Sequence, residues 1–197
     1  MQGLLALSRI IDAAMTRIGR SIAWFIFIAV LVSTINALIR KIFNTSSNSW
    51  LELQWLLFGF VFLLCSPWTL LSNEHIRIDI INSKLPPRWR SVIELLGHTL
   101  FLLPFTVIMV LTAGPFAWRS LIGNEQSSNA GGLPLWPAKL LVLVGFLALF
   151  LQAVSEIIKR IAIMRGDLAD TLSGGGHHAS AEAEAERLLA QTDHRPA

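Results

Sequence analysis

The sequence has few charged residues. Only 15% of its 197 residues are Asp, Glu, Lys or Arg, whereas soluble domains carry about 25%. This deficit excludes an intrinsically disordered regulator and a well-solvated α/β enzyme. Cysteine is scarcer still: Cys65 is the only one, so no disulfide can form within the chain.

Motifs for catalysis and for cofactor binding are also missing. The sequence has no phosphate-binding P-loop, no nucleophile elbow, no HExxH and no cysteine cluster. No two histidines are placed to hold a haem between spans. We therefore expect no enzymatic activity, no cofactor and no metal, and the absence of a nucleic-acid-binding motif leaves nucleic acid out as a partner.

Apolar residues are plentiful instead: they make up 53% of the chain, and the mean hydropathy is +0.58. They gather in four runs of about the 20 residues that a helix needs to cross a bilayer, at 22–39, 51–71, 92–117 and 140–158. Because backbone groups must bond internally in lipid, each run is predicted to be helical. The sequence thus predicts an all-α membrane protein, a bundle of four transmembrane helices. Pro104 should kink the third helix, and Pro67 should disturb the end of the second.

Lysine and arginine predict the orientation, because they concentrate on the cytoplasmic side of membrane proteins. Of those near the span ends, ten lie on the side of the two termini and four on the opposite side. Both termini are therefore expected in the cytoplasm. The seven tryptophans, beside no tyrosine, all fall near predicted span ends, as indole rings do at lipid boundaries.

Three regions follow from this pattern: an amphipathic N-terminal segment (1–20), the four-helix transmembrane domain (21–160) and a flexible cytoplasmic tail (161–197). The N-terminal segment has apolar residues at helical spacing, with polar residues between them. This pattern fits a helix lying in the membrane interface and also an extension of the first span into the cytosol, and both interpretations remain open. The apolar positions are Leu4, Leu7, Ile11, Met15 and Ile18.

Few polar side chains enter the spans, and those few lie near span ends. Glu52 opens the second span; Glu94 and His98 open the third, and Gln152 and Glu156 close the fourth. Each of the last two pairs is four residues apart and so shares one helix face. One hypothesis is a proton or ion relay between the two faces, with His98 titrating near neutral pH. We favour hydrogen bonding that holds the third and fourth helices together, because no ionisable residue lies at the bilayer centre.

Two longer motifs carry a family resemblance. Glu52 precedes an aromatic and apolar run from Trp55 to Trp68, which is followed by the segment 74–80 (EHIRIDI). The second motif has Glu125-Gln126-Ser127 and then the segment 131–139 (GGLPLWPAK) before the fourth span. Over roughly residues 15–165 the chain resembles the small membrane subunit, the DctQ-like component, of tripartite ATP-independent periplasmic (TRAP) transporters.

The resemblance implies a three-part importer, with the spans of this chain in a bacterial inner membrane. A periplasmic solute-binding protein captures the solute, a large membrane subunit moves it with sodium, and the small subunit braces the large one as a scaffold. The second motif is similar to the branch associated with 2-oxo acids, mannitol-like or aromatic acids, so an organic acid is the expected solute. The alternatives are a membrane anchor of a redox enzyme complex and a self-contained small transporter or channel.

Nine residues are the candidates for partner contacts or structural polar contacts. Among them, the 74–80 segment would face the large subunit or lipid, and Glu125 would face the binding protein. The nine are Glu52, His75, Arg77, Asp79, Glu94, His98, Glu125, Gln152 and Glu156.

Overall fold

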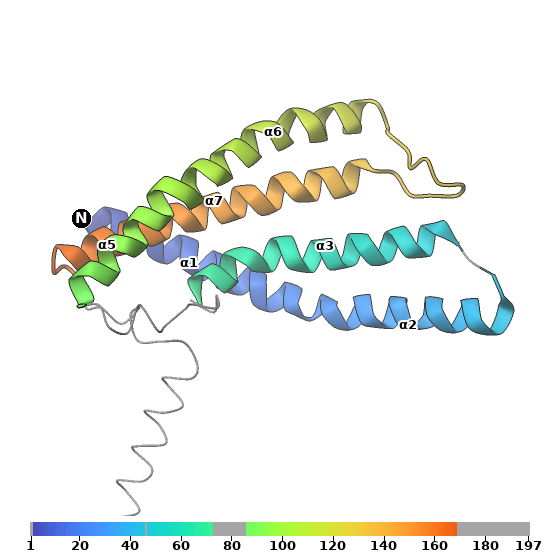
Figure 1. Ribbon diagram of the computed structural model, residues 1–197, viewed down its shortest axis with the longest axis horizontal. Coiled ribbons are helices and arrows are strands. Elements are labelled where there is room, and N and C mark those ends of the chain that lie inside the picture. The colour runs from blue at the N-terminus through green and yellow to red at the C-terminus, as the bar shows by residue number, and fades with distance from the viewer. Residues whose placement is uncertain (1, 46, 73–85, 169–197) are drawn as a thin grey trace, which may run out of the picture.

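The computed structural model describes residues 2–45, 47–72 and 86–168, and this part of the chain is almost entirely helical (Figure 1). Only the connections and a single β-bridge, between Gln126 and Pro134, interrupt the helices. In chain order the elements are α1 (Gln2–Ala23), α2 (Phe25–Phe43), α3 (Asn48–Leu71), α5 (Pro87–Gly97), the π turn η1 (His98–Leu102), α6 (Leu103–Ile122) and α7 (Trp136–Met164).

Four helical stretches are long and apolar enough to cross a membrane, which confirms the number of spans. Each extends past its predicted bounds: they cover Gln2–Phe43, Asn48–Leu71, Ser91–Ile122 and Trp136–Met164. The first is interrupted at Trp24, which separates α1 from α2. With 19 residues, α2 alone is about 28 Å long, close to the thickness of the hydrocarbon core.

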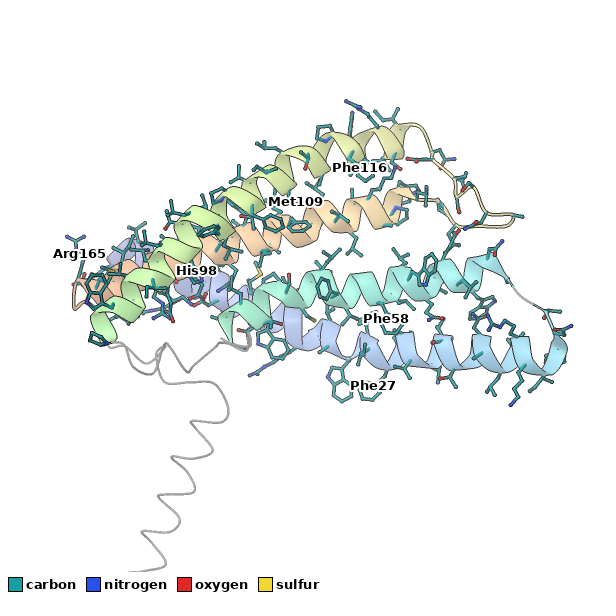
Figure 2. The ribbon with its side chains drawn as sticks, in the orientation of Figure 1. Phe27, Phe58, His98, Met109, Phe116 and Arg165 are labelled. Carbon is teal, nitrogen blue, oxygen red and sulfur yellow. The ribbon has the colours of Figure 1, made fainter. Side chains whose placement is uncertain are left out.

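The spans lie side by side in the order α2, α3, α7, α6, as an open layer rather than the expected bundle (Figure 1). α3 and α7 are the central helices and pack on each other, while α2 packs mainly on α3, and α6 on α7. The edge helices therefore keep much apolar surface exposed. Phe27 on α2, for example, is 65% exposed and points away from the layer (Figure 2).

α1 crosses α3 and α7 at the end of the layer where α7 ends. We call this the terminal end, and the opposite end, with the α6–α7 connection, the loop end. The inward face of α1 carries Ser8, Met15, Gly19 and Ile22, all buried. Of the predicted apolar positions, Met15 turns inward, whereas Leu4, Leu7 and Ile18 remain at least 41% exposed.

Pro67 and Pro104 both lie where the hydrogen bonding of their helices changes. Pro104 follows the π turn, in which the Leu103 amide bonds to the His98 carbonyl five residues back. Near the proline that was predicted to kink the third span, the backbone hydrogen bonds thus change from the α to the π pattern. α3 continues through Pro67 to Leu71. Pro67 cannot donate to the Leu63 carbonyl four residues back, and the Ser66 hydroxyl donates to it instead, at 2.9 Å.

Small residues allow the helix backbones to approach. A Cβ added to Gly19 would lie 2.6 Å from the Trp68 Cβ, and one added to Gly145 would lie 2.8 Å from the Leu63 Cβ. Ala153 and Ala162 of α7 are fully buried. Close backbone contact through small residues is the usual way in which helices associate in lipid, where apolar burial alone gives little attraction.

Candidate functional site: polar clusters at the two ends of the layer

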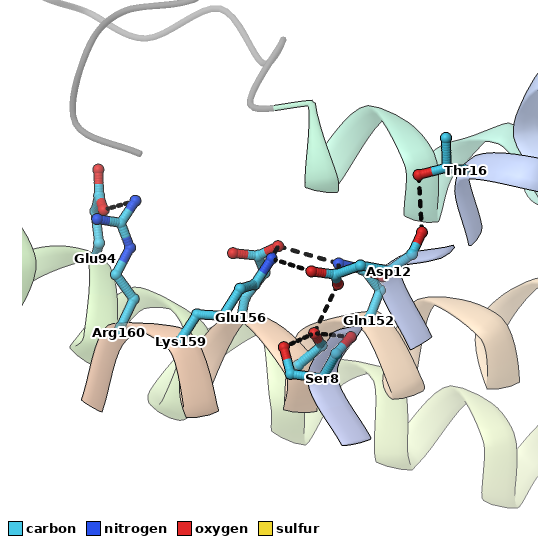
Figure 3. A network of polar contacts seen from close by, with 9 residues as sticks. Ser8, Asp12, Thr16, Glu94, Gln152, Glu156, Lys159 and Arg160 are labelled. Atoms are coloured by element: carbon cyan, nitrogen blue, oxygen red, sulfur yellow. Dashed lines mark hydrogen bonds and ion pairs between the residues drawn. The ribbon is translucent and has the colours of Figure 1, made fainter. Parts of the chain in front are cut away.

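A buried ionic cluster joins α1 to α7 at the terminal end (Figure 3). Its centre is Lys159, whose ammonium lies 2.6 Å from Glu156 Oε1 and 3.0 Å from Asp12 Oδ2. The Lys159 and Glu156 side chains are only 9% and 7% exposed. Since a buried charge is tolerated only when it is paired and hydrogen-bonded, this cluster depends on all three groups. It consists of Ser8, Asp12, Gln152, Ser155, Glu156 and Lys159.

Neutral side chains complete the buried ionic cluster. The Gln152 amide donates to Asp12 Oδ1 and to Glu156 Oε1, both at 3.0 Å. The Ser155 hydroxyl donates to Asp12 Oδ1 at 2.7 Å and lies 2.7 Å from the Ser8 hydroxyl. Because the Ser155 proton is used on Asp12, Ser8 donates to Ser155. Hydrogen bonds thus run from α1 across to α7 through both serines and the glutamine.

A second ion pair links the third and fourth spans. Arg160 of α7 pairs with Glu94 of α5, and the two side chains are only 3% and 12% exposed. His98, one turn after Glu94, has its Nδ1 atom 2.6 Å from the Glu94 carbonyl oxygen of its own helix. The third span is therefore tied to the fourth by Glu94, while the described contacts of His98 stay on its own helix.

These contacts can be compared with the two hypotheses for the polar residues at the span ends, a proton or ion relay and hydrogen bonding between the third and fourth helices. Gln152 and Glu156 do share a face and bond to each other. Their partners across the helix interface come from α1 through Asp12, not from the third span. The described contacts thus join the helices structurally and do not connect His98 to Glu156 as a relay would need.

Sequence reasoning missed five members of these contacts: Ser8, Asp12, Ser155, Lys159 and Arg160. A signal was present on α7, where positions 152, 155, 156, 159 and 160 are polar at the spacing of one helix face. Lys159 and Arg160 had been counted only as charges marking the cytoplasmic side. Their pairing with carboxylates in the interior explains why a polar face can be buried here.

At the loop end, Glu52 of α3 holds the connection between α6 and α7. One carboxylate oxygen accepts from the Ser127 hydroxyl and, at 2.8 Å, from the Asn129 amide. The other accepts from the Leu133 backbone amide at 2.6 Å. Charged acceptors make stronger hydrogen bonds than neutral ones, so Glu52 anchors residues 127–133 to the first turn of α3.

The first turn of α3 supplies two more bonds to this loop. The Asn48 amide donates to the Ala130 carbonyl at 3.0 Å, and the Ser49 hydroxyl donates to the Gly131 carbonyl. Gly131 has φ +70°, a value that favours glycine, and a Cβ on Gly132 would lie 2.9 Å from Glu52 Oε1. Both glycines of the GGLPLWPAK motif are therefore needed for the loop to close over Glu52.

Glu125 also binds within the chain, through an ion pair with Lys139 in the first turns of α7. Lys139 lies over the Phe116 ring as well, with its ammonium 4.1 Å from the ring centre. The Lys139 ammonium, followed by the Ser120 hydroxyl, holds the pKa of Glu125 below its usual value. A lysine at a helix N-terminus opposes the helix dipole, and Glu125 offsets this charge.

Removal of the Glu52 carboxylate should release the loop. In Glu52→Ala the Leu133 amide loses its acceptor, and we expect its hydrogen exchange to accelerate by on the order of tenfold or more. Hydrogen–deuterium exchange with mass spectrometry over residues 123–135 measures this effect. Gln126→Ala is the matched control, because that side chain bonds only to Asn124 of its own loop. Equal exchange in the two variants would contradict an anchoring role for Glu52.

The described residues offer no group of three or more His, Cys, Asp or Glu that could hold a metal. Nor do Asp, Glu, Lys, Arg or His occur within 25–39, 53–71, 99–118 or 140–155, the apolar stretches of the spans. The ionised groups thus lie at the two ends of the layer, where they fix helices and a loop. His75, Arg77 and Asp79 lie outside the described residues.

A comparison with family models identifies one that matches residues 10–162, described as "Tripartite ATP-independent periplasmic transporters, DctQ component". The match includes all four spans, apart from residues 2–9 of the first and 163–164 of the fourth, and both polar clusters except Ser8. It confirms the resemblance carried by the sequence motifs. Comparison with curated proteins and with solved structures gave no significant match.

Proposed function

Because this chain belongs to the DctQ component family of tripartite ATP-independent periplasmic transporters, we propose that it braces the large membrane subunit of a sodium-coupled organic-acid importer as a fixed scaffold. The family is that of the small membrane subunit of these transporters. The proposal adds the scaffold role, the sodium coupling and the class of solute. It also places both termini in the cytoplasm and the spans in the inner membrane.

The open layer is the observation that carries the scaffold role. Four helices in a closed bundle would bury their apolar faces against each other, whereas the central helix α3 leaves aromatic side chains uncovered. Trp55 and Phe62 are 69% and 75% exposed, and Phe58 lies on the same face. We call Trp55, Phe58 and Phe62 the α3 aromatic stripe and propose that the large subunit covers it. The polar clusters tie the helices together at one end of the layer and a loop to α3 at the other, which supports a fixed scaffold.

The placement of charge supports transport by the partner rather than by this chain. A solute or ion site in a transporter normally lies near the bilayer midplane, where this chain has no ionised side chain. In the part of the chain that the structure describes, Asp12, Glu94, Glu125 and Glu156 each pair with a lysine or an arginine near the ends of the spans. The family membership gives no support to the alternative of an anchor for a redox enzyme.

Reconstitution tests the proposal. The large subunit and the binding protein are placed in proteoliposomes with and without this chain, and sodium-driven uptake of labelled 2-oxo acids is measured. We expect uptake only when all three proteins are present. Unchanged uptake without this chain would reject the scaffold role, and uptake by this chain alone would make it a transporter in its own right.

Two variants locate the contact. Phe62→Ala should lower the yield of large subunit that co-purifies with this chain, because truncating a well-packed aromatic anchor weakens an interface. Phe101→Ala is the matched control, since Phe101 is 76% exposed but lies in η1, beside the edge helix α6. Equal yields for Phe62→Ala, Phe101→Ala and the wild-type chain would place the interface elsewhere.

A further inference from the structure

An open groove of about 720 Å³ lies along the loop end of α6. Phe116, labelled in Figure 2, stands beside it near the end of the helix. Its apolar lining residues Leu111, Pro115 and Phe116 precede its charged ones, Arg119, Glu125 and Lys139, which lie nearer the loop end. We call the apolar part the floor of the groove and the charged part its mouth. None of these residues takes part in the buried ionic cluster or in the Glu52 contacts.

The polarity of the groove changes along one helix face. Thr112, Phe116, Arg119 and Gly123 recur at the spacing of a single α-helical face, and all four are exposed. The distance along α6 from Leu111 to Gly123 is about 18 Å. Half of a hydrocarbon core is about 15 Å thick. The groove is therefore long enough to reach from the acyl-chain region of a bilayer to the lipid headgroups.

The charges at the mouth favour an anionic group. Lys139 and Glu125 neutralise each other in their ion pair. Arg119 makes no ion pair with any residue that the structure describes, so one positive charge is left over at the mouth. A guanidinium presents a planar fork of donors that matches two phosphate oxygens at once.

We propose that this groove binds a glycerophospholipid, with its phosphate on Arg119 and an acyl chain along Leu111, Pro115 and Phe116. The combination of an apolar floor with a cation at one end fits an amphiphile. It does not fit free phosphate, for which the floor would contribute nothing. The lipid lies against the edge helix α6 and extends the apolar edge of the layer.

The test uses the purified full chain in a phosphate-free detergent, with phosphatidylglycerol as the probe. Native mass spectrometry measures the fraction of chain that carries one lipid at each lipid concentration. Arg119→Gln should weaken binding by about tenfold, the loss of roughly one charge-assisted hydrogen bond. Arg40→Gln is the matched control, because Arg40 is also an exposed cation at the loop end but lies on α2. It should bind as the wild-type chain does.

Two further measurements test whether binding depends on the acyl chain of the lipid. Thr112→Trp keeps Arg119 and places a bulky side chain in the floor of the groove, so it too should weaken binding. Glycerol phosphate, which has the headgroup without the tails, should not compete at concentrations where the lipid binds. The proposal is overturned if Arg119→Gln binds like the wild-type chain, if Arg40→Gln loses as much, if Thr112→Trp binds normally, or if glycerol phosphate displaces the lipid. Should Arg119→Gln fail to fold by circular dichroism, the Thr112→Trp arm still decides.

Discussion

Lys159→Met is expected to lower the free energy of unfolding by about 3 kcal/mol, because breaking a buried ion pair from one side leaves its partners uncompensated. Lys159 is the cation between Asp12 and Glu156. Without it, two carboxylates share the single Gln152 amide that bonds to both. The effect is measurable by chemical unfolding in detergent followed by circular dichroism.

Two controls make this result specific. Lys41→Met removes an exposed lysine at the end of α2 and should change stability by less than about 0.5 kcal/mol. The triple variant Asp12→Asn, Glu156→Gln, Lys159→Met removes all three charges together, and we expect it to recover most of the loss, since neutral groups need no counter-charge. If Lys159→Met is no less stable than Lys41→Met, the buried ionic cluster does not hold α1 to α7.

The number of spans could be predicted from the sequence because it depends on local composition. An apolar run of about 20 residues has no other stable form in lipid than a helix. The positions of Pro67 and Pro104 also marked the places where the helical hydrogen bonds change, since a missing amide acts on its own helix. The bounds were less accurate, because helices such as α7 continue beyond the apolar run as polar turns.

The arrangement of the helices could not be predicted in the same way. Whether four apolar helices close into a bundle or stay open depends on which faces carry small residues, such as Gly19 and Gly145, opposite a suitable neighbour. The contacts of α1 could not be predicted for a related reason. Ser8 and Asp12 bond to the polar side of α7, a partner that the amphipathic pattern of a single helix does not reveal.

The polar contacts were also only partly predictable: the sequence indicated which residues need a partner, but not which partner each one has. Glu52, Glu94, Gln152 and Glu156 were recognised as unusual because a charge or amide near a span needs a partner. Their partners come from segments far away in the sequence: Glu52 binds a loop about 80 residues later. Such pairs can be identified only when the positions of the helices are known. In the structure, several residues that were candidates for partner contacts bond within the chain instead.

Gly145→Leu should be the most disruptive change in the middle of the layer, with a cost of about 3 kcal/mol from overpacking. A Cβ at Gly145 would lie 2.8 Å from the Leu63 Cβ and 3.3 Å from the Leu63 carbonyl oxygen. Neither atom is the end of a flexible side chain, so α3 and α7 must move apart. Because these two helices are the centre of the layer, their separation should also reduce assembly with the large subunit.

Gly59→Leu is the matched control for this prediction. It makes the same exchange in a spanning helix, but no atom lies within 4 Å of the added Cβ. Replacing a helical glycine there should leave stability unchanged or raise it slightly, since glycine is a poor helix former. Chemical unfolding is measured for both variants. Co-purification with the large subunit is measured for Gly145→Leu only, because Gly59 lies on the same face of α3 as Trp55 and Phe62. Equal stability of the two variants would mean that the close approach of α3 and α7 does not hold the layer together. A loss of stability confined to Gly145→Leu would identify the contact between Gly145 and Leu63 as the one that holds α3 against α7.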